Sequence, residues 1–182
     1  QSETAAAIRA ELGFMEGLTQ NFEALLEGDA QGELELVELD ALVERLQHRF
    51  APLAADRGLA FDVALPDEPI LAAADAIALE RAIGNLIHNA LRWASGNVVL
   101  LLWREGEEAR LEVRDDGPGL GEVTTTAVER GVRSPDARGE GWGLGLAIAE
   151  AFARRLGGRL ELSAGPEGGT HAAIVLPASS TT

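Results

Sequence analysis

The sequence predicts an α+β fold, an α/β two-layer sandwich in which a mixed sheet packs on three helices. From residue 38 onward, helical and strand patterns follow one another as αββαββ, a polar segment, and then αββ. Strands that arrive in pairs between helices favour this architecture over regular βαβ winding. The 182 residues are 46% apolar, which is enough for a packed core. Because no stretch reaches the roughly 20 consecutive apolar residues of a membrane-spanning helix, we expect a soluble domain.

The first part of the chain predicts a separate helix. Residues 1–28 share one helical pattern, which the glycines at positions 28 and 32 end. Apolar residues spaced by about 3.5 positions are typical of a helix that packs against another helix. No later segment predicts a matching partner, so we expect residues 1–30 to be half of an interrupted helical hairpin that precedes a domain at 31–182. Docking of this helix on its own domain is the alternative. The apolar stripe comprises Ile8, Leu12, Met15, Phe22 and Leu25 or Leu26.

The domain begins with a helix and two strands. An amphipathic pattern predicts a helix over 39–57 that starts near Asp40. A strand over 59–65 follows, ended by a Pro-Asp turn, and a short strand over 70–73 comes next.

The second helix has the clearest periodicity. Asp75 predicts its N-cap, and the helix runs to about Ala94. Apolar residues recur at the i, i+3, i+4, i+7 and i+8 positions, which places them on one face, toward the sheet. This face comprises Ile83, Leu86, Ile87, Ala90 and Leu91, and the opposite, polar face comprises Arg81, Asn85, His88, Asn89 and Arg92.

The remaining elements surround a long polar segment. A nearly continuous apolar run over 97–103 predicts an interior strand, and a second strand follows over 110–115. Residues 116–142 are too long and too polar for a simple connection, and predict a functional loop or lid at about 120–142. A helix over 143–156 ends at two glycines, and strands over 159–164 and 170–176 complete the sheet.

Composition excludes several classes of function. The net charge of −15 argues against nucleic-acid binding, which draws on clustered basic residues. Cysteine is absent, so neither a disulfide framework nor a thiolate metal site can form. All fifteen basic residues are Arg, and this excludes Walker-A loops, the protein Ser/Thr kinase fold and Schiff-base enzymes, because each requires Lys.

Three groups of residues suggest ligand binding. Asn85 and Asn89 lie one helical turn apart, so their amide oxygens could ligate a hard cation such as Mg²⁺ while Arg92 meets phosphate charge. Asp115 shares the inward parity of its strand, where a carboxylate needs a donor such as an adenine amino group. Two solvated asparagines and a structural turn with a capping Asp are the plainer alternatives.

The third group is rich in glycine. A G-x-G-x-G pattern over 139–145 opens a helix, where bare N–H groups could receive phosphate, and it does not match the Rossmann fingerprint. Arg133 and Arg138 precede it and are placed to close on a triphosphate. A glycine-rich hinge and ordinary surface arginines are the alternatives here.

Three motifs in order closely resemble the N, G1 and G2 boxes of bacterial sensor histidine kinases. They are E-R-A-I-G-N-L-I-H-N-A-L-R-W (80–93), D-D-G-P-G (115–119) and G-W-G-L-G-L-A-I (141–148). The terminal pattern G-G-R-L-E-L-S…G-G-T-H-A-A-I-V-L-P extends the resemblance, and the segment E-R-G-V-R-S-P-D-A-R-G-E-G resembles the lid of the EnvZ/PhoQ-like group. The resemblance implies a Bergerat-type ATP-binding fold, with the first thirty residues as the end of the second dimerisation helix.

The resemblance also implies roles for single residues. Asn89 would ligate Mg²⁺ that bridges the ATP phosphates, Trp93 would stack on adenine, and Asp115 would receive the adenine amino group. Asn85 would support the phosphate side, and Arg92 stands where the family has Lys or Arg. The glycines Gly117, Gly119, Gly141, Gly143 and Gly145, together with Leu144 and Leu146, would shape the pocket and lid, and Arg133 and Arg138 match lid arginines that reach phosphate.

Two features depart from the family pattern. Val128 and Gly131 stand where the lid often has a Phe-x-x-Phe box. The three histidines, His48, His88 and His171, are not in a phosphoacceptor motif, and the acidic base beside that histidine is missing.

Together these features predict a histidine kinase catalytic domain that binds ATP and Mg²⁺ and phosphorylates a histidine on a dimerisation domain outside this sequence. Its expected partners are that phosphoacceptor domain and a response-regulator receiver domain, with no nucleic acid, a homodimer in the full-length protein, and a location in the cytoplasmic portion of an inner-membrane sensor. The alternatives are another ATPase of the same superfamily, or a degenerate nucleotide-binding or docking module without kinase activity.

Overall fold

The computed structural model describes residues 33–119, 144–166 and 168–179. The predicted appendage at 1–30 and the predicted lid at about 120–142 lie outside these residues, so both remain predictions. The described elements are strand β1 (Glu35–Glu38), helix α2 (Leu39–Ala55), strands β2 (Ala60–Ala64) and β3 (Leu71–Ala74), helix α3 (Ala76–Trp93), strands β4 (Asn97–Glu105) and β5 (Glu108–Asp115), helix α5 (Leu144–Arg155), and strands β6 (Arg159–Ala164) and β7 (Thr170–Pro177).

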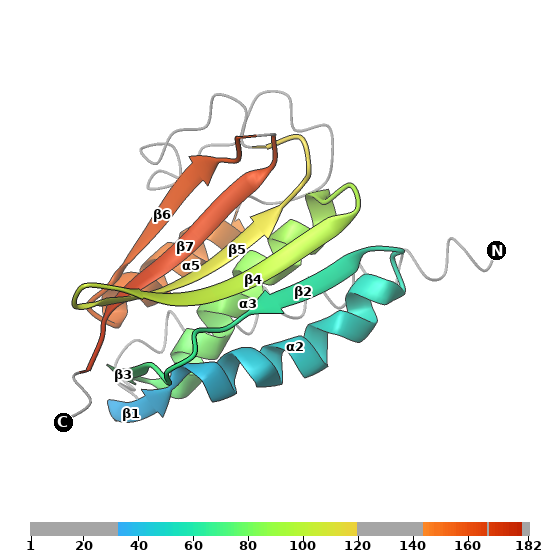
Figure 1. Ribbon diagram of the computed structural model, residues 1–182. Coiled ribbons are helices and arrows are strands. Elements are labelled where there is room, and N and C mark those ends of the chain that lie inside the picture. The colour runs from blue at the N-terminus through green and yellow to red at the C-terminus, as the bar shows by residue number, and fades with distance from the viewer. Residues whose placement is uncertain (1–32, 120–143, 167, 180–182) are drawn as a thin grey trace. The chain divides into compact units, whose positions relative to one another are not determined.

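Five strands form one mixed sheet in the order β2-β4-β5-β7-β6. The β2–β4 pair is parallel, and the other three pairs are antiparallel. Strands β1 and β3 form a separate antiparallel pair. Helices α2, α3 and α5 cover one face of the large sheet (Figure 1). The predicted two-layer α+β sandwich is therefore confirmed, and every predicted strand and helix in the described residues is present.

The core lies between α3 and the inward face of the sheet. All five apolar residues predicted to face the sheet from α3 are at most 3% exposed. Leu100, Leu111 and Ile174 meet them from three neighbouring strands, and each is fully buried. In the described parts of the chain, no helix is both long and apolar enough to cross a membrane.

The ends of α2 and α3 are fixed by carboxylates. Asp75 Oδ1 accepts hydrogen bonds from the N–H groups of Ile77 and Ala78, both at 3.0 Å, which confirms the predicted N-cap. Asp40 Oδ2 accepts from Ile70 N–H at 2.8 Å, and Leu39 N–H donates to Ile70 O at 2.9 Å. These bonds attach the start of α2 to the residue that precedes β3.

Strand β1 was not predicted from the sequence. It lies in the segment E-L-E-L-V-E, whose alternating polar and apolar residues are typical of a strand with its leucines facing inward. The structure has the opposite arrangement, because Leu34 and Leu36 are 67% and 62% exposed while Val37 is 6% exposed. The alternation was therefore a usable signal for the strand and a misleading one for its buried face.

His88 does not share the polar environment predicted for its helix face. Its ring packs edge-on against Phe50 of α2, with the centroids 5.0 Å apart and the planes at 82°. Burial, with the nearby charges of Arg49 and Arg57, lowers the pKa of His88 to about 4. His88 is thus a half-buried, neutral side chain at pH 7 that packs against α2.

The depressed pKa of His88 predicts a loss of stability in mild acid. Below about pH 6.5 the unfolded chain protonates this histidine, whereas the folded chain resists until about pH 4. The free energy of unfolding should therefore fall through this window, by up to about 3 kcal/mol. Urea unfolding of the wild type and His88→Gln between pH 7 and pH 4 measures it. The wild type should lose more stability than the variant, and equal losses would contradict the assignment.

Candidate functional site

The C-terminal end of α3 and the end of β5 meet at one end of the sheet. The carboxylate of Asp116, the residue after β5, accepts hydrogen bonds from three consecutive N–H groups that follow α3. Ser95 and Gly96 donate to Oδ1 at 2.8 and 3.0 Å, and Asn97 donates to Oδ2 at 3.0 Å. Two motifs that lie about twenty residues apart in the chain are therefore held in direct contact.

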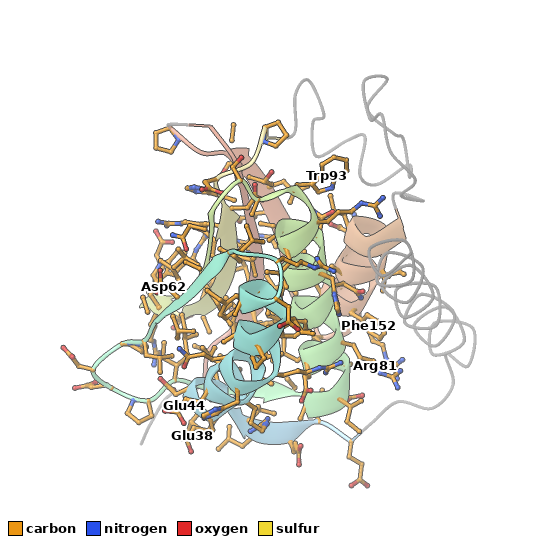
Figure 2. The ribbon with its side chains drawn as sticks, turned by 90° about the vertical axis from the view of Figure 1, so that its right-hand side faces the viewer. Glu38, Glu44, Asp62, Arg81, Trp93 and Phe152 are labelled. Carbon is orange, nitrogen blue, oxygen red and sulfur yellow. The ribbon has the colours of Figure 1, made fainter. Side chains whose placement is uncertain are left out.

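Helix α3 contributes four predicted site residues from its second half. Asn85 and Asn89 are half-buried and lie one turn apart. The Arg92 guanidinium lies over the Trp93 ring, 5.6 Å from its centroid. Trp93 is 36% exposed and stands at the C-terminal end of the helix (Figure 2). This end of α3 combines amide oxygens, a cation and an accessible aromatic surface.

Asp115 is a buried carboxylate at the end of β5. It is 7% exposed and shares the inward face of Leu111 and Val113, as predicted. Its Oδ1 accepts from Gly117 N–H at 2.9 Å, and the backbone N–H and hydroxyl of Thr170 also donate to it. Burial raises the pKa of Asp115, these hydrogen bonds oppose the rise, and the charge of Asp116 adds to it. A ligand group that donates a hydrogen bond would offset part of this cost.

Glycines allow the backbone around Asp115 to pack closely. A Cβ on Gly117 would lie 2.3 Å from the carbonyl oxygen of Trp93 and 2.9 Å from Asp115 Oδ1. Gly169, which precedes Thr170, has φ +81°, and a Cβ there would lie 1.9 Å from Asp115 O. Side chains at these positions would push β5, α3 and the start of β7 apart.

We expect Gly117→Ala to destabilise the protein, because its methyl group would collide with the Trp93 carbonyl. A loss of about 1–3 kcal/mol is expected, as for other overpacked sites. Gly84→Ala is a matched control on α3: its Cβ would meet Phe50 at an ordinary 3.7 Å, and Ala favours a helix over Gly. Thermal unfolding of both variants tests this, and Gly117→Ala unfolding no earlier than Gly84→Ala would contradict it.

The structure describes part of the rest of the predicted site. Gly119, with φ +78°, lies against the carbonyl of Gly169, and Leu146 is half-buried on α5. Leu144 and Gly145 belong to the first turn of α5. Four predicted residues lie outside the described part of the chain: Arg133, Arg138, Gly141 and Gly143.

Sequence reasoning missed two residues of this site. Thr170 is 6% exposed and donates to Asp115 from the start of β7. A signal was available, because Thr170 has the same inward parity as Ala172 and Ile174 and is the one polar residue among them. Asp116 gave no such signal, because its three donors follow α3 and become neighbours only in the folded chain.

Known proteins match this chain in sequence. A family model for the histidine kinase-, DNA gyrase B-, and HSP90-like ATPases matches residues 74–180. The chain is 43% identical over 96 residues to the sensor protein kinase CarS of Pseudomonas aeruginosa, and the match covers 52% of this chain and 21% of CarS. It is 37% identical over 150 residues to the sensor histidine kinase GtrS of the same organism, across 82% of this chain and 30% of GtrS. The chain thus spans less than a third of these two relatives.

Solved structures match its fold. The mycobacterial sensor histidine kinase MprB has a TM-score of 0.68 and 29% sequence identity, across 81% of this chain and 99% of the MprB chain. A TM-score of 0.68 across 81% of this chain indicates that the two chains share this fold.

Proposed function

Because this chain belongs to the family of histidine kinase-, DNA gyrase B- and HSP90-like ATPases, we propose that it is a histidine kinase catalytic domain. It binds Mg-ATP and transfers the γ-phosphoryl group to a histidine on the dimerisation domain of a two-component sensor. One observation carries the proposal: the buried carboxylate of Asp115 is tied through Asp116 to the end of the helix that bears Asn89. The named relatives, sensor kinases of P. aeruginosa, support the same activity.

The adenine side of the proposed site is built around Asp115. Its carboxylate is buried and its pKa is raised, so it gains from a donor such as the adenine amino group. Trp93 offers an exposed aromatic face at the same end of the sheet, on which the base can stack. Gly117 lets the backbone that follows Asp115 pack against the Trp93 carbonyl, and Gly119 lets it pack against Gly169, which keeps these segments close to the proposed adenine site.

The phosphate side is assigned to α3 and to the glycine-rich segment that precedes α5. Asn89 supplies an amide oxygen for Mg²⁺, a hard cation that prefers oxygen ligands, and the half-buried Asn85 one turn away supports the phosphates beside it. Arg92 adds positive charge. When bound, Mg²⁺ neutralises charge on the β- and γ-phosphates. Leu144, Leu146 and the glycines of the G2 box border the phosphates, and Arg133 and Arg138 close over them. These glycines are Gly141, Gly143 and Gly145.

The reaction breaks the bond between the γ-phosphorus and the oxygen that bridges it to ADP, and forms a bond from that phosphorus to an imidazole nitrogen. The domain positions ATP and neutralises charge, and the acceptor supplies the nucleophile. The environments of two of this chain's histidines favour an acceptor elsewhere. The half-buried His88 packs edge-on against Phe50, and His171 Nδ1 lies 3.7 Å from Glu112 Oε1, on the sheet.

The same proposal includes partners and location. The direct partner is the dimerisation domain, of which residues 1–30 are the C-terminal part, and the phosphoryl group then passes to a receiver domain. The full-length protein is a homodimer with this domain on the cytoplasmic side of the membrane. The net charge of −15 argues against a nucleic-acid partner.

Labelled ATP tests the activity. We expect the full-length protein to acquire an acid-labile, alkali-stable label from γ-labelled ATP and none from α-labelled ATP. This 182-residue chain alone should bind ATP and remain unlabelled. Stable acid-labile label on the chain alone would contradict the assignment of the acceptor. Steady-state ATP hydrolysis without label on the full-length protein would favour an ATPase of the same family, and tight ATP binding with neither activity would favour a degenerate binding module.

A further inference from the structure

Asp115 and Asp116 are adjacent aspartates with opposite environments. Asp115 points into the protein, and burial raises its pKa. Asp116 is exposed, and hydrogen bonds from Gly96, Asn97 and Ser95 lower its pKa. The proposed nucleotide site assigns a task to Asp115 and none to Asp116.

The bonds of Asp116 join the two halves of that site. Its carboxylate accepts from three successive N–H groups at 2.8–3.0 Å, directly after the helix that carries Asn89 and Trp93. The same residue is covalently attached to Asp115 on one side and Gly117 on the other. Gly117 in turn donates to Asp115 Oδ1 at 2.9 Å. The position of the Asp115 carboxylate relative to α3 therefore depends on the segment that Asp116 anchors.

We propose that Asp116 is a positioning residue of the nucleotide site. Through its hydrogen bonds to residues 95–97, Asp116 sets the distance between the Asp115 carboxylate, which contacts the base, and helix α3, which binds the phosphates. The inference rests on the proposed function, since it concerns how that site selects adenine. Asp116 itself need not touch the nucleotide.

The chemistry of the contact explains why aspartate stands at 116. Two carboxylate oxygens are needed, because Oδ1 takes the Ser95 and Gly96 donors and Oδ2 takes the Asn97 donor. Asparagine keeps one acceptor oxygen, so it can preserve the first two bonds but not the third. Alanine preserves none. The series Asp, Asn, Ala at this position should therefore give a graded response.

The test compares ATP and GTP in the 182-residue chain with Mg²⁺ present. Non-hydrolysable analogues of both nucleotides are titrated by calorimetry into the wild type, Asp116→Asn and Asp116→Ala, at a temperature where all are folded. Guanine carries a carbonyl oxygen where adenine has its amino group, so a well-placed Asp115 favours ATP. We expect Asp116→Ala to weaken the ATP analogue on the order of tenfold, with little change for GTP, and Asp116→Asn to fall between. Asp62→Ala is the matched control, an exposed aspartate on β2 well away from Trp93 (Figure 2).

The outcomes separate this inference from the function on which it rests. A fall in ATP-over-GTP preference that is graded from Asn to Ala and absent in Asp62→Ala supports the positioning role. A purely structural role would lower the unfolding temperature and leave the preference of the folded molecules unchanged, and that result would overturn the inference. If the wild type bound no ATP analogue, the proposed function itself would be wrong. Should Asp116→Ala not fold, the comparison of wild type with Asp116→Asn decides.

Discussion

Replacing Asn89 by alanine is expected to reduce Mg-ATP-dependent phosphorylation of the full-length protein by roughly 100-fold or more. The variant removes an amide oxygen from the half-buried polar face of α3, where it is the proposed ligand of the metal. The metal positions the phosphates and neutralises their charge, so its loss should affect the reaction more than the binding of the base. The initial rate of acid-labile labelling measures the effect.

Measuring nucleotide binding with and without metal shows whether the lower rate of Asn89→Ala comes from the loss of metal binding. In EDTA, Asn89→Ala and the wild type should bind ATP with similar affinity. When Mg²⁺ is added, the affinity for ATP should increase only in the wild type. Arg81→Ala is the control on the same helix, because Arg81 is exposed and lies far down α3 from Trp93 (Figure 2). A variant that kept the wild-type rate of labelling would show that Asn89 is not a metal ligand.

The second large effect is expected at Asp115. Asp115→Asn should weaken ATP binding by roughly 30- to 100-fold, since it replaces a charged acceptor in a buried site with a group that also donates. The same change should not destabilise the fold at neutral pH. Because burial raises the pKa of Asp115, its charged form is the costly one, and its contribution to stability is lost as pH rises through that pKa.

Calorimetry and thermal unfolding of the same samples separate these two effects. Glu112→Gln is the control, a buried carboxylate on the same strand whose side chain contacts Arg114 and His171 and not the proposed site. The affinity of the wild type for ATP should also decrease as the pH is lowered through the raised pKa of Asp115, because protonation removes the charged acceptor. Asp115→Asn should lack this pH dependence. Equal affinities of the wild type and Asp115→Asn for ATP would show that Asp115 does not bind the nucleotide.

Local patterns were sufficient for most of the fold. The buried face of α3 followed from its periodicity, the N-cap from Asp75, and the inward direction of Asp115 from the parity of β5. Each of these depends on residues within a turn or a strand of one another. Asn85, Asn89 and Arg92 were found from the same helical periodicity, whereas Trp93 came from the resemblance. The structure places the backbone that follows Trp93 against the residue that follows β5.

Contacts between distant segments were not accessible to the same reasoning. His88 shares the helical face of Asn85 and Asn89, and only the packing of α2 decides that it meets Phe50. Leu34 and Leu36, just before and within β1, follow strand alternation and still face outward, whereas Val37 is buried. Asp116 likewise acquires its three hydrogen-bond donors from residues that precede it by about twenty positions.

The central claim is that α3, the end of β5 and the glycine-rich segment before α5 hold one nucleotide. A crystal structure of this chain with Mg²⁺ and a non-hydrolysable ATP analogue tests it most directly. The expected complex has the adenine amino group within hydrogen-bond distance of the Asp115 carboxylate and the metal on Asn89 Oδ1. A nucleotide bound elsewhere, or an adenine that leaves Asp115 without contact, would contradict the claim.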